Sequence, residues 1–206
     1  MALAHTGDEA ERAAPPRREV RGAGDAVRRR IVDVALELIA AHGFAATTTR
    51  EIAERLGFTK AALYYHFRSK DDLLAAMVAP AVDDLTALVD MAPPHPSAAD
   101  RRRVLEGYVD VVEAHRDLVR VLSNDPSING RTALAAALRI YGRLQQVLSA
   151  DPEPDAAQRT RVRAALGAAH AALLGAPDGD DAAVVRQAAV AAACAALGIS
   201  PQHTAR

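Results

Sequence analysis

The sequence is poor in cysteine and in aromatic residues. It contains one cysteine, Cys194, no tryptophan, four tyrosines and three phenylalanines among 206 residues. A single cysteine cannot form an intrachain disulfide, which is typical of a reducing, cytoplasmic compartment. The longest uninterrupted apolar run, residues 188–197, is ten residues long and too short to span a bilayer. The N-terminal residues include Asp8, Glu9 and Glu11 and no apolar segment, so we expect no secretory signal and a cytoplasmic protein.

Signatures of catalysis and of metal binding are also missing. The seven histidines form no HxxxH or HExxH pair, and one cysteine cannot supply a CxxC motif. The sequence contains neither the GxSxG motif of hydrolases nor the phosphate-binding GxxxxGK[ST] motif. We therefore expect a protein that is not an enzyme and that has no metal site and no cofactor.

Charge is balanced overall but not along the chain. The 25 lysines and arginines face 26 aspartates and glutamates. Residues 1–70 carry 12 basic and 9 acidic side chains, whereas residues 71–206 carry 13 basic and 17 acidic ones. Both lysines, Lys60 and Lys70, and five of the seven aromatic residues fall between residues 44 and 70. Only this part of the chain favours a nucleic-acid partner.

The segment from Arg28 to Val78 carries the strongest signals of local structure. Residues 27, 31, 34, 35 and 38 are apolar and predict an amphipathic helix that ends at Gly43. Thr48 and Glu51 have the spacing of a capping box, which predicts that the next helix begins at Thr49. Gly57 ends that helix, and Thr59 caps a short helix over residues 60–66.

Two helices joined by about three residues around a glycine form the helix-turn-helix motif of DNA-binding proteins. The motifs Gly43-Phe44, TTREIA at 48–53, LGFTK at 56–60, LYYHF at 63–67 and SKDDL at 69–73 together resemble the N-terminal domain of TetR-family transcriptional regulators. The resemblance covers about fifty residues and implies a homodimer. It also implies a C-terminal helical domain that binds a small molecule and thereby weakens the grip on an operator.

The resemblance and the side-chain chemistry together suggest which residues contact DNA. Lys60 can reach a guanine edge or a phosphate, and Ala61 and Ala62 can approach thymine methyl groups. Arg50 is long enough to read a base. The remaining expected contacts, mostly to phosphates, are Thr48, Thr49, Thr59, Tyr64, Tyr65, His66 and Lys70. We expect one of the two tyrosines, Tyr64, to pack inward. The alternative is that Arg50 and Lys60 are merely exposed surface charges.

Residues 1–24 have no apolar periodicity and contain Pro15 and Pro16, so we expect them to be a disordered basic arm. Arg17, Arg18 and Arg21 could lie along a phosphate backbone, or the arm could be a solvated tail. We expect the DNA-binding domain at 25–72, a helical ligand-binding and dimerisation domain at 73–200 and a tail at 201–206.

The predicted architecture is all-α, with about nine helices. After the DNA-binding domain, helical spacing continues to about residue 90 and is interrupted by Pro80, where we expect a kink. Further helices are expected from Ser97, around 117–122, and over 131–148, 155–174 and 181–197. Apolar residues expected to face inward in the 131–148 helix are Leu134, Leu138, Tyr141, Leu144 and Leu148.

The last two helices are dominated by alanine, whose small side chain lets helices approach closely. They could form a four-helix homodimer interface, or the alanine content could reflect codon bias alone. Only Tyr108 and Tyr141 supply aromatic rings beyond residue 70, so we expect any effector pocket to be mostly aliphatic. Its expected polar residues are Tyr108, His115, Asn124, Tyr141 and His170.

These features favour a repressor that binds a palindromic DNA operator as a homodimer and is released by an unknown small-molecule effector. Its paired recognition helices would lie about 34–36 Å apart. Two alternatives stay open: a helix-turn-helix regulator without an effector, and a helical-bundle binding protein in which the motif is only packing.

Overall fold

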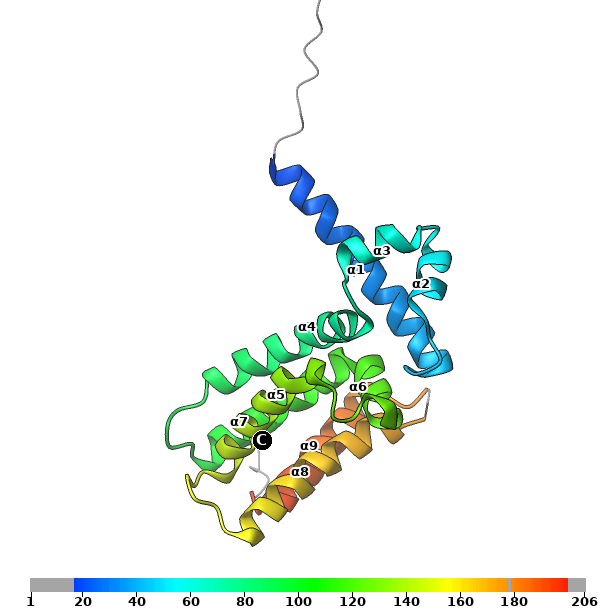
Figure 1. Cartoon of the computed structure of the whole chain (residues 1–206). Helices are drawn as coiled ribbons and strands as arrows, with labels where there is room; N and C mark the ends of the chain where they lie inside the picture. The colour runs from blue at the N-terminus through cyan, green and yellow to red at the C-terminus, as the bar shows by residue number, and fades with distance from the viewer. Residues whose placement is uncertain (1–16, 178, 200–206) are drawn as a thin grey trace, which may run out of the picture.

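The described residues, 17–177 and 179–199, form nine α-helices and two short 3-10 helices in the computed structural model (Figure 1). The first four helices are α1 (Arg17–His42), α2 (Thr49–Leu56), α3 (Lys60–His66) and α4 (Lys70–Asp90). The others are α5 (Ala98–Ala114), α6 (Arg116–Asn124), η1 (Pro126–Ile128), η2 (Thr132–Leu134), α7 (Ala135–Ser149), α8 (Ala156–Gly175) and α9 (Ala182–Leu197). The all-α prediction with about nine helices is confirmed for this part of the chain.

Residues 17–78, which we call the head, comprise α1, α2, α3 and the first half of α4. Their apolar side chains converge on one core, in which Ile31, Phe44, Ile52, Leu63 and Phe67 are buried. The core continues beyond the head, because Leu118 and Val121 of α6 and Ile128 of η1 belong to the same buried cluster. The packing of this core extends across the domain boundary that we predict between residues 72 and 73, and the boundary itself stays a prediction.

Residues 79–199, which we call the body, pack around a second core formed by α5, α7, α8, α9 and the later part of α4. In Figure 1, α8 and α9 lie side by side along their length, at the far end of the molecule from α3. Alanines at 165, 169, 189 and 193 are buried in this core. Because their side chains are small, the two helix axes can approach closely.

Helix α4 links the two cores. It starts at the Ser69 cap, whose hydroxyl accepts a hydrogen bond from the Asp72 amide at 3.0 Å. Leu73, Leu74 and Met77 enter the head core, and Val89 enters the body core. The helix continues through Pro80 to Asp90.

Two local predictions need correction. Helix α1 begins at Arg17, so residues 17–24 are helical and not part of a disordered arm. The helix expected from residue 131 begins at Ala135, after η1 and η2, and Leu138 is 64% exposed instead of buried. The buried row of α7 is Ile140, Leu144 and Leu148. The predictions for residues 1–16 and for the tail fall outside the described residues.

Candidate nucleic-acid interface

Helix α2 is fixed at both ends by caps that the sequence predicts. The Thr48 hydroxyl accepts from the Glu51 amide at 3.1 Å, and the Glu51 carboxylate accepts from the Thr48 amide at 3.4 Å, which completes the capping box. Helix α2 ends at Gly57, whose φ of 71° lies in the left-handed region that favours glycine. The direction in which the chain leaves α2 is thereby set by a residue without a side chain.

Helix α3 starts at the Thr59 cap, where the Thr59 hydroxyl accepts from the Ala62 amide at 3.1 Å. Within its seven residues only Leu63 is buried. Lys60, Ala61 and Ala62 are all exposed. The helix is therefore anchored to the head by one leucine and presents most of its surface to solvent, as a helix that enters a DNA groove must.

The two tyrosines of α3 differ in exposure. Tyr64 is 39% exposed and Tyr65 is 87% exposed. The Tyr64 hydroxyl lies 3.4 Å from the Thr49 hydroxyl, and the Lys60 ammonium lies 5.6 Å from the centre of the Tyr64 ring. Tyr64 is thus the more covered of the two, but the expectation that it packs inward is wrong, because Leu63 takes the inward position.

Arg50 lies on the exposed side of α2 and pairs with Glu54 at 2.7 Å, one helical turn away. The hydrogen bond to Glu54 is the main reason why the pKa of Arg50 is raised. A base contact by Arg50 requires the guanidinium to leave Glu54, which costs little because an exposed pair of this kind contributes little to stability.

Lys70 occupies a different environment from the other basic candidates. Its ammonium donates a hydrogen bond to the Phe44 carbonyl and lies 4.1 Å from the centre of the Phe44 ring. Burial, followed by the nearby Arg131, lowers the pKa of Lys70. The phosphate contact that we predicted for Lys70 would require the side chain to leave this position, so the structure favours a packing role.

Phe44 joins the head to the body. Its amide donates a hydrogen bond to the Asp125 carboxylate, which also accepts from the Ser127 amide at 3.0 Å. The Arg131 guanidinium lies 4.5 Å from the centre of the Phe44 ring and pairs with Asp71 at 2.7 Å. The hydrogen bonds from Ser127 and Phe44 lower the pKa of Asp125, so this carboxylate stays charged.

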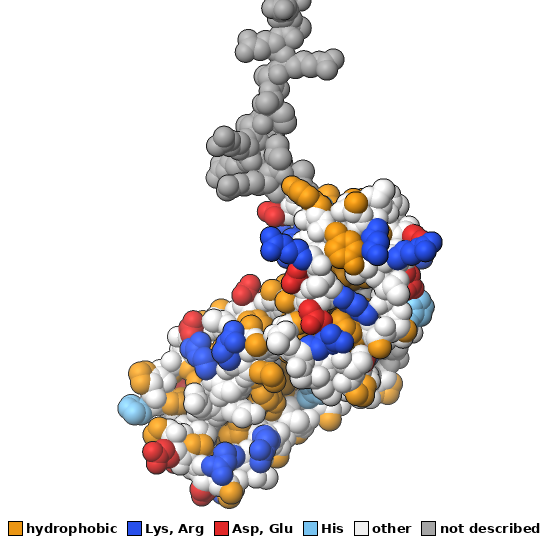
Figure 2. Space-filling view, in the orientation of Figure 1, with side chains coloured by type: hydrophobic (Ala, Val, Ile, Leu, Met, Phe, Trp, Pro, Cys, Tyr) orange, Lys and Arg blue, Asp and Glu red, His pale blue; other side chains and the backbone are white. Residues whose placement is uncertain are grey.

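A shallow groove of about 620 Å³ runs beside the C-terminal end of α3. Its lining includes Arg28 of α1 and Arg68, two cations that we had not selected as contact residues, together with Tyr65 and His66. In the space-filling view, basic side chains gather over the head beside a hydrophobic patch (Figure 2). A DNA backbone that flanks α3 would meet positive charge here.

Comparison with known proteins supports this geometry. The family described as bacterial regulatory proteins, tetR family, matches residues 31–77. A solved structure of the TetR-family regulator PfmR from Thermus thermophilus is 25% identical, with a TM-score of 0.59, over 84% of this chain and 100% of the other. The chain belongs to the TetR family. Regulators of this family are not enzymes, in agreement with the expectation from the sequence.

Curated relatives match about a quarter of this chain. The regulator YerO of Bacillus subtilis is 49% identical over 47 residues, which cover 23% of this chain and 16% of YerO. The class C tetracycline repressor of Escherichia coli is 46% identical over 50 residues, which cover 24% of this chain and 23% of the repressor. A TetR-like regulator from Rhodococcus sp. RHA1 shares the fold, with a TM-score of 0.63 at 23% identity, over 84% of this chain and 94% of the other.

The five residues expected to line an effector pocket do not come together in this TetR-family fold. Tyr108 is 5% exposed, burial raises its pKa, and Tyr141 is close enough to add to that effect. His115 pairs with Asp84 of α4 at 2.7 Å. The His170 ring lies 2.9 Å from the Ser123 hydroxyl, and burial lowers its pKa. Tyr108 and Tyr141 lie close together, whereas His115 and His170 have partners outside the set.

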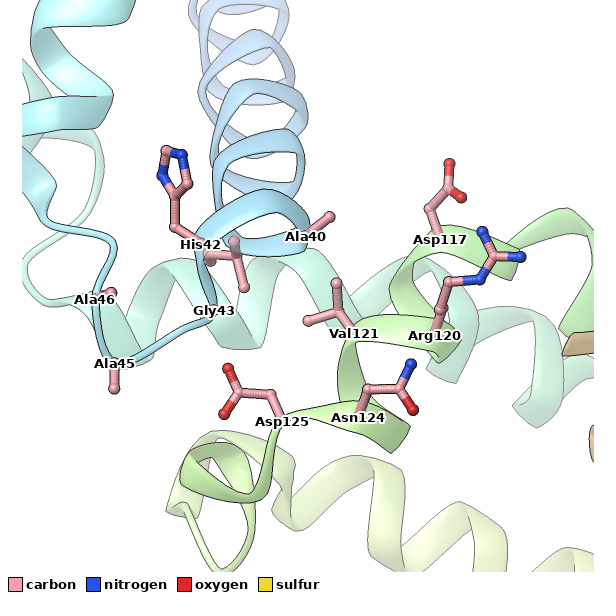
Figure 3. Close-up of a pocket in the computed structure, with 11 residues that line it drawn as sticks. Ala40, His42, Gly43, Ala45, Ala46, Asp117, Arg120, Val121, Asn124 and Asp125 are labelled. Atoms are coloured by element: carbon pink, nitrogen blue, oxygen red, sulfur yellow. The ribbon is translucent and has the colours of Figure 1, made fainter.

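Asn124, the fifth of these residues, lies in a cleft between the head and α6 (Figure 3). The cleft measures about 560 Å³, and its lining includes Ala40 and His42 from α1 and Asp117 and Arg120 from α6.

Within the described residues, no group of three or more histidine, cysteine or acidic side chains is placed to hold a metal ion. None of the described helices combines the length and the hydropathy of a transmembrane segment.

Proposed function

We propose that this TetR-family protein is a homodimeric transcriptional repressor that reads a palindromic operator with helix α3. The exposure of α3 carries this proposal. One buried leucine holds the helix, and its outward residues include an ammonium, two methyl groups and a phenol. These groups match what the major groove offers, namely guanine acceptors, thymine methyls and flanking phosphates.

The outward face of α8 and α9 supports the dimer. Along α8, Ala164, Gly167 and Ala171 are exposed, and along α9 Ala188 and Ala191 are exposed. Small side chains allow a second copy of the two helices to pack closely against this face. A two-fold dimer then places two α3 helices on one side of the molecule, as a palindromic site requires.

Release of the operator by a small molecule is the second part of the proposal, and we place the protein in the cytoplasm, where it meets both operator and effector. The cleft between α1 and α6 has a volume in the range of ligand sites and lies where the head meets the body. An effector that preferred one arrangement of head and body would shift the population away from the DNA-binding state. A regulator without an effector is the alternative.

The DNA-binding proposal is tested with duplexes recovered by genome-wide footprinting of the wild-type protein. We expect Lys60→Ala to weaken binding and to reduce the slope of log affinity against log salt by about one, if Lys60 contacts a phosphate. Arg139→Ala, which removes an exposed charge from α7, is the matched control. Equal affinity for Lys60→Ala and Arg139→Ala at two salt concentrations would refute the role of Lys60, and a wild-type protein that enriches no DNA would refute the function.

Thermal-shift screening of metabolites tests effector binding. A compound that binds only the folded protein at a hundred times its Kd stabilises it by about 2.7 kcal/mol and therefore raises the melting temperature. A hit must also lower operator affinity to act as an effector. A complete screen without such a hit would favour the regulator that needs none.

A further inference from the structure

We propose that Arg28 is a positioning residue that holds the C-terminal end of the recognition helix α3. This inference rests on the proposed function, because the position of α3 matters only if α3 reads DNA. Arg28 lies three residues before the segment that matches the family, so the match itself assigns no role to it.

The C-terminal end of α3 needs an external partner. The last carbonyls of any helix find no N–H donor within the helix. A glycine in the left-handed conformation commonly ends a helix and helps to supply donors to them. Here the residue after the helix is Phe67, with an extended φ of −140°. Its amide donates back to the Leu63 carbonyl at 3.0 Å, but no left-handed turn follows. The final turn of α3 therefore has fewer capping hydrogen bonds than a helix that ends in a left-handed glycine.

Arg28 supplies that partner from 38 residues away. Its guanidinium donates a hydrogen bond to the His66 carbonyl at 2.8 Å. The same guanidinium lies 4.1 Å from the centre of the Phe67 ring, which is buried in the head core. A cation at a helix C-terminus also interacts favourably with the helix dipole. Two contacts on adjacent residues therefore fix the guanidinium and the end of α3 together.

Helix α1 holds Arg28 in place. Ile31, one turn further along α1, and Ala35 are both fully buried in the head core. Residues three apart on a helix share a face, so anchoring Ile31 directs Arg28 toward the same side, where α3 ends. Arg28 thereby ties the end of α3 to a helix that is anchored in the head core.

Two roles for Arg28 predict different outcomes. A phosphate contact contributes long-range charge, so its loss weakens specific and non-specific binding alike and reduces the salt slope by about one. A positioning contact keeps Lys60 and its neighbours in register with base edges. Its loss therefore weakens specific binding, while the salt slope and non-specific binding stay close to wild type.

The test compares Arg28→Ala with Arg29→Ala, which removes the same charge from the next, exposed position of α1. Hydrogen exchange on the DNA-free protein comes first. We expect amides of residues 65–67 to exchange about fivefold faster in Arg28→Ala than in Arg29→Ala, because the final turn of α3 frays. Equal exchange in the two variants would overturn the proposal, whatever the protein binds.

Anisotropy with the footprinted duplex and with a scrambled duplex of equal length follows. We expect Arg28→Ala to lose about tenfold in the ratio of specific to non-specific affinity, with an unchanged salt slope. A parallel loss on both duplexes with a smaller slope would identify a phosphate contact and overturn the positioning role. If Arg28→Ala unfolds, Arg28→Lys, which keeps the charge but not the planar group over Phe67, should show both effects in weaker form. A wild-type protein without specific binding would refute the proposed function, while hydrogen exchange would still decide the contact.

Discussion

The head and the body differ in how strictly their structure depends on particular residues. The family match covers residues 31–77, within the head, and the curated relatives match 47 to 62 residues, whereas solved structures match the fold over 80% to 87% of the chain. In the head, caps and a left-handed glycine fix the angle at which α3 leaves α2. In the body, alanine-rich helices pack through small side chains that many sequences can supply. A surface that must fit DNA therefore requires particular residues, while a helical scaffold requires mainly size and periodicity.

The comparison also shows that head and body are not independent. Phe44 belongs to the head core, yet its amide, its carbonyl and its ring contact Asp125, Lys70 and Arg131. Two of these three partners lie beyond residue 120. A change in α6 or η1 can therefore reach the turn before α2 through Phe44 as well as through the shared apolar core. An effector in the neighbouring cleft would thus have a physical route to the head.

Removing Phe44 should produce the largest effect. Phe44 is 1% exposed, and truncating a buried phenylalanine to alanine costs about 3–5 kcal/mol. We expect Phe44→Ala to lower the free energy of unfolding by this amount, and Phe58→Ala, which removes a partly buried ring from the same core, to cost less. Urea titration followed by circular dichroism at one fixed protein concentration measures both. Separate transitions for head and body in wild-type protein would show that the Phe44 contacts do not couple the two.

A charge on the outer face of α9 should weaken dimerisation through the body and leave the structure of the head unchanged. Ala191 is exposed there, and an arginine at this position would be buried without a partner in the proposed dimer. We expect Ala191→Arg to weaken dimerisation at least about 100-fold, or about 2.7 kcal/mol. Sedimentation velocity measures the change, with Ala136→Arg on exposed α7 as the control. A dimer of unchanged strength would place the interface elsewhere.

The sequence predicts the head well because its signals are local. Thr48, Thr59 and Gly57 each act within three residues along the chain, and the structure shows each of them as predicted. Such capping patterns can be recognised without knowledge of the fold. The contact from Arg28 to the end of α3 spans 38 residues and leaves no comparable pattern.

The body is predicted in outline but not in detail. Helix number follows from apolar periodicity and from the proline-rich and glycine-rich breaks between helices. The start of α7 cannot be predicted from periodicity. The 3-10 helices η1 and η2 precede it, and Arg131 between them pairs with Asp71, 60 residues earlier. Leu138 faces solvent because the buried row passes through Ile140 and Leu144. The effector candidates were selected for polarity alone, which says nothing about which helices become neighbours.

Removing a local cap tests the claim that the head depends on such signals. The Thr59 hydroxyl holds the first turn of α3, and loss of an N-cap typically costs about 1 kcal/mol. We expect Thr59→Ala to lower the free energy of unfolding by this amount and to weaken operator binding, while Thr59→Ser keeps both. Thr160→Ala, which removes an exposed hydroxyl from within α8, should change stability less. An equal loss in Thr59→Ala and Thr160→Ala would mean that the head has no special dependence on its caps.

The smallest effect concerns His170, which lies in the body beside Ser123 of α6. Burial lowers the pKa of His170 below its ordinary value of 6.5, so near pH 6 the unfolded chain binds more protons than the folded protein. His170 therefore stabilises the fold fully above pH 6.5, and this contribution decreases as the pH falls through the lowered pKa. We expect the difference in unfolding free energy between wild type and His170→Gln to shrink between pH 7 and pH 5, as measured by urea titration at each pH. His42 and His115 lie beside carboxylates in both proteins, so the difference isolates His170. A constant difference across this range would show that His170 keeps its ordinary pKa when folded, and that the contact between α6 and α8 is insensitive to protonation.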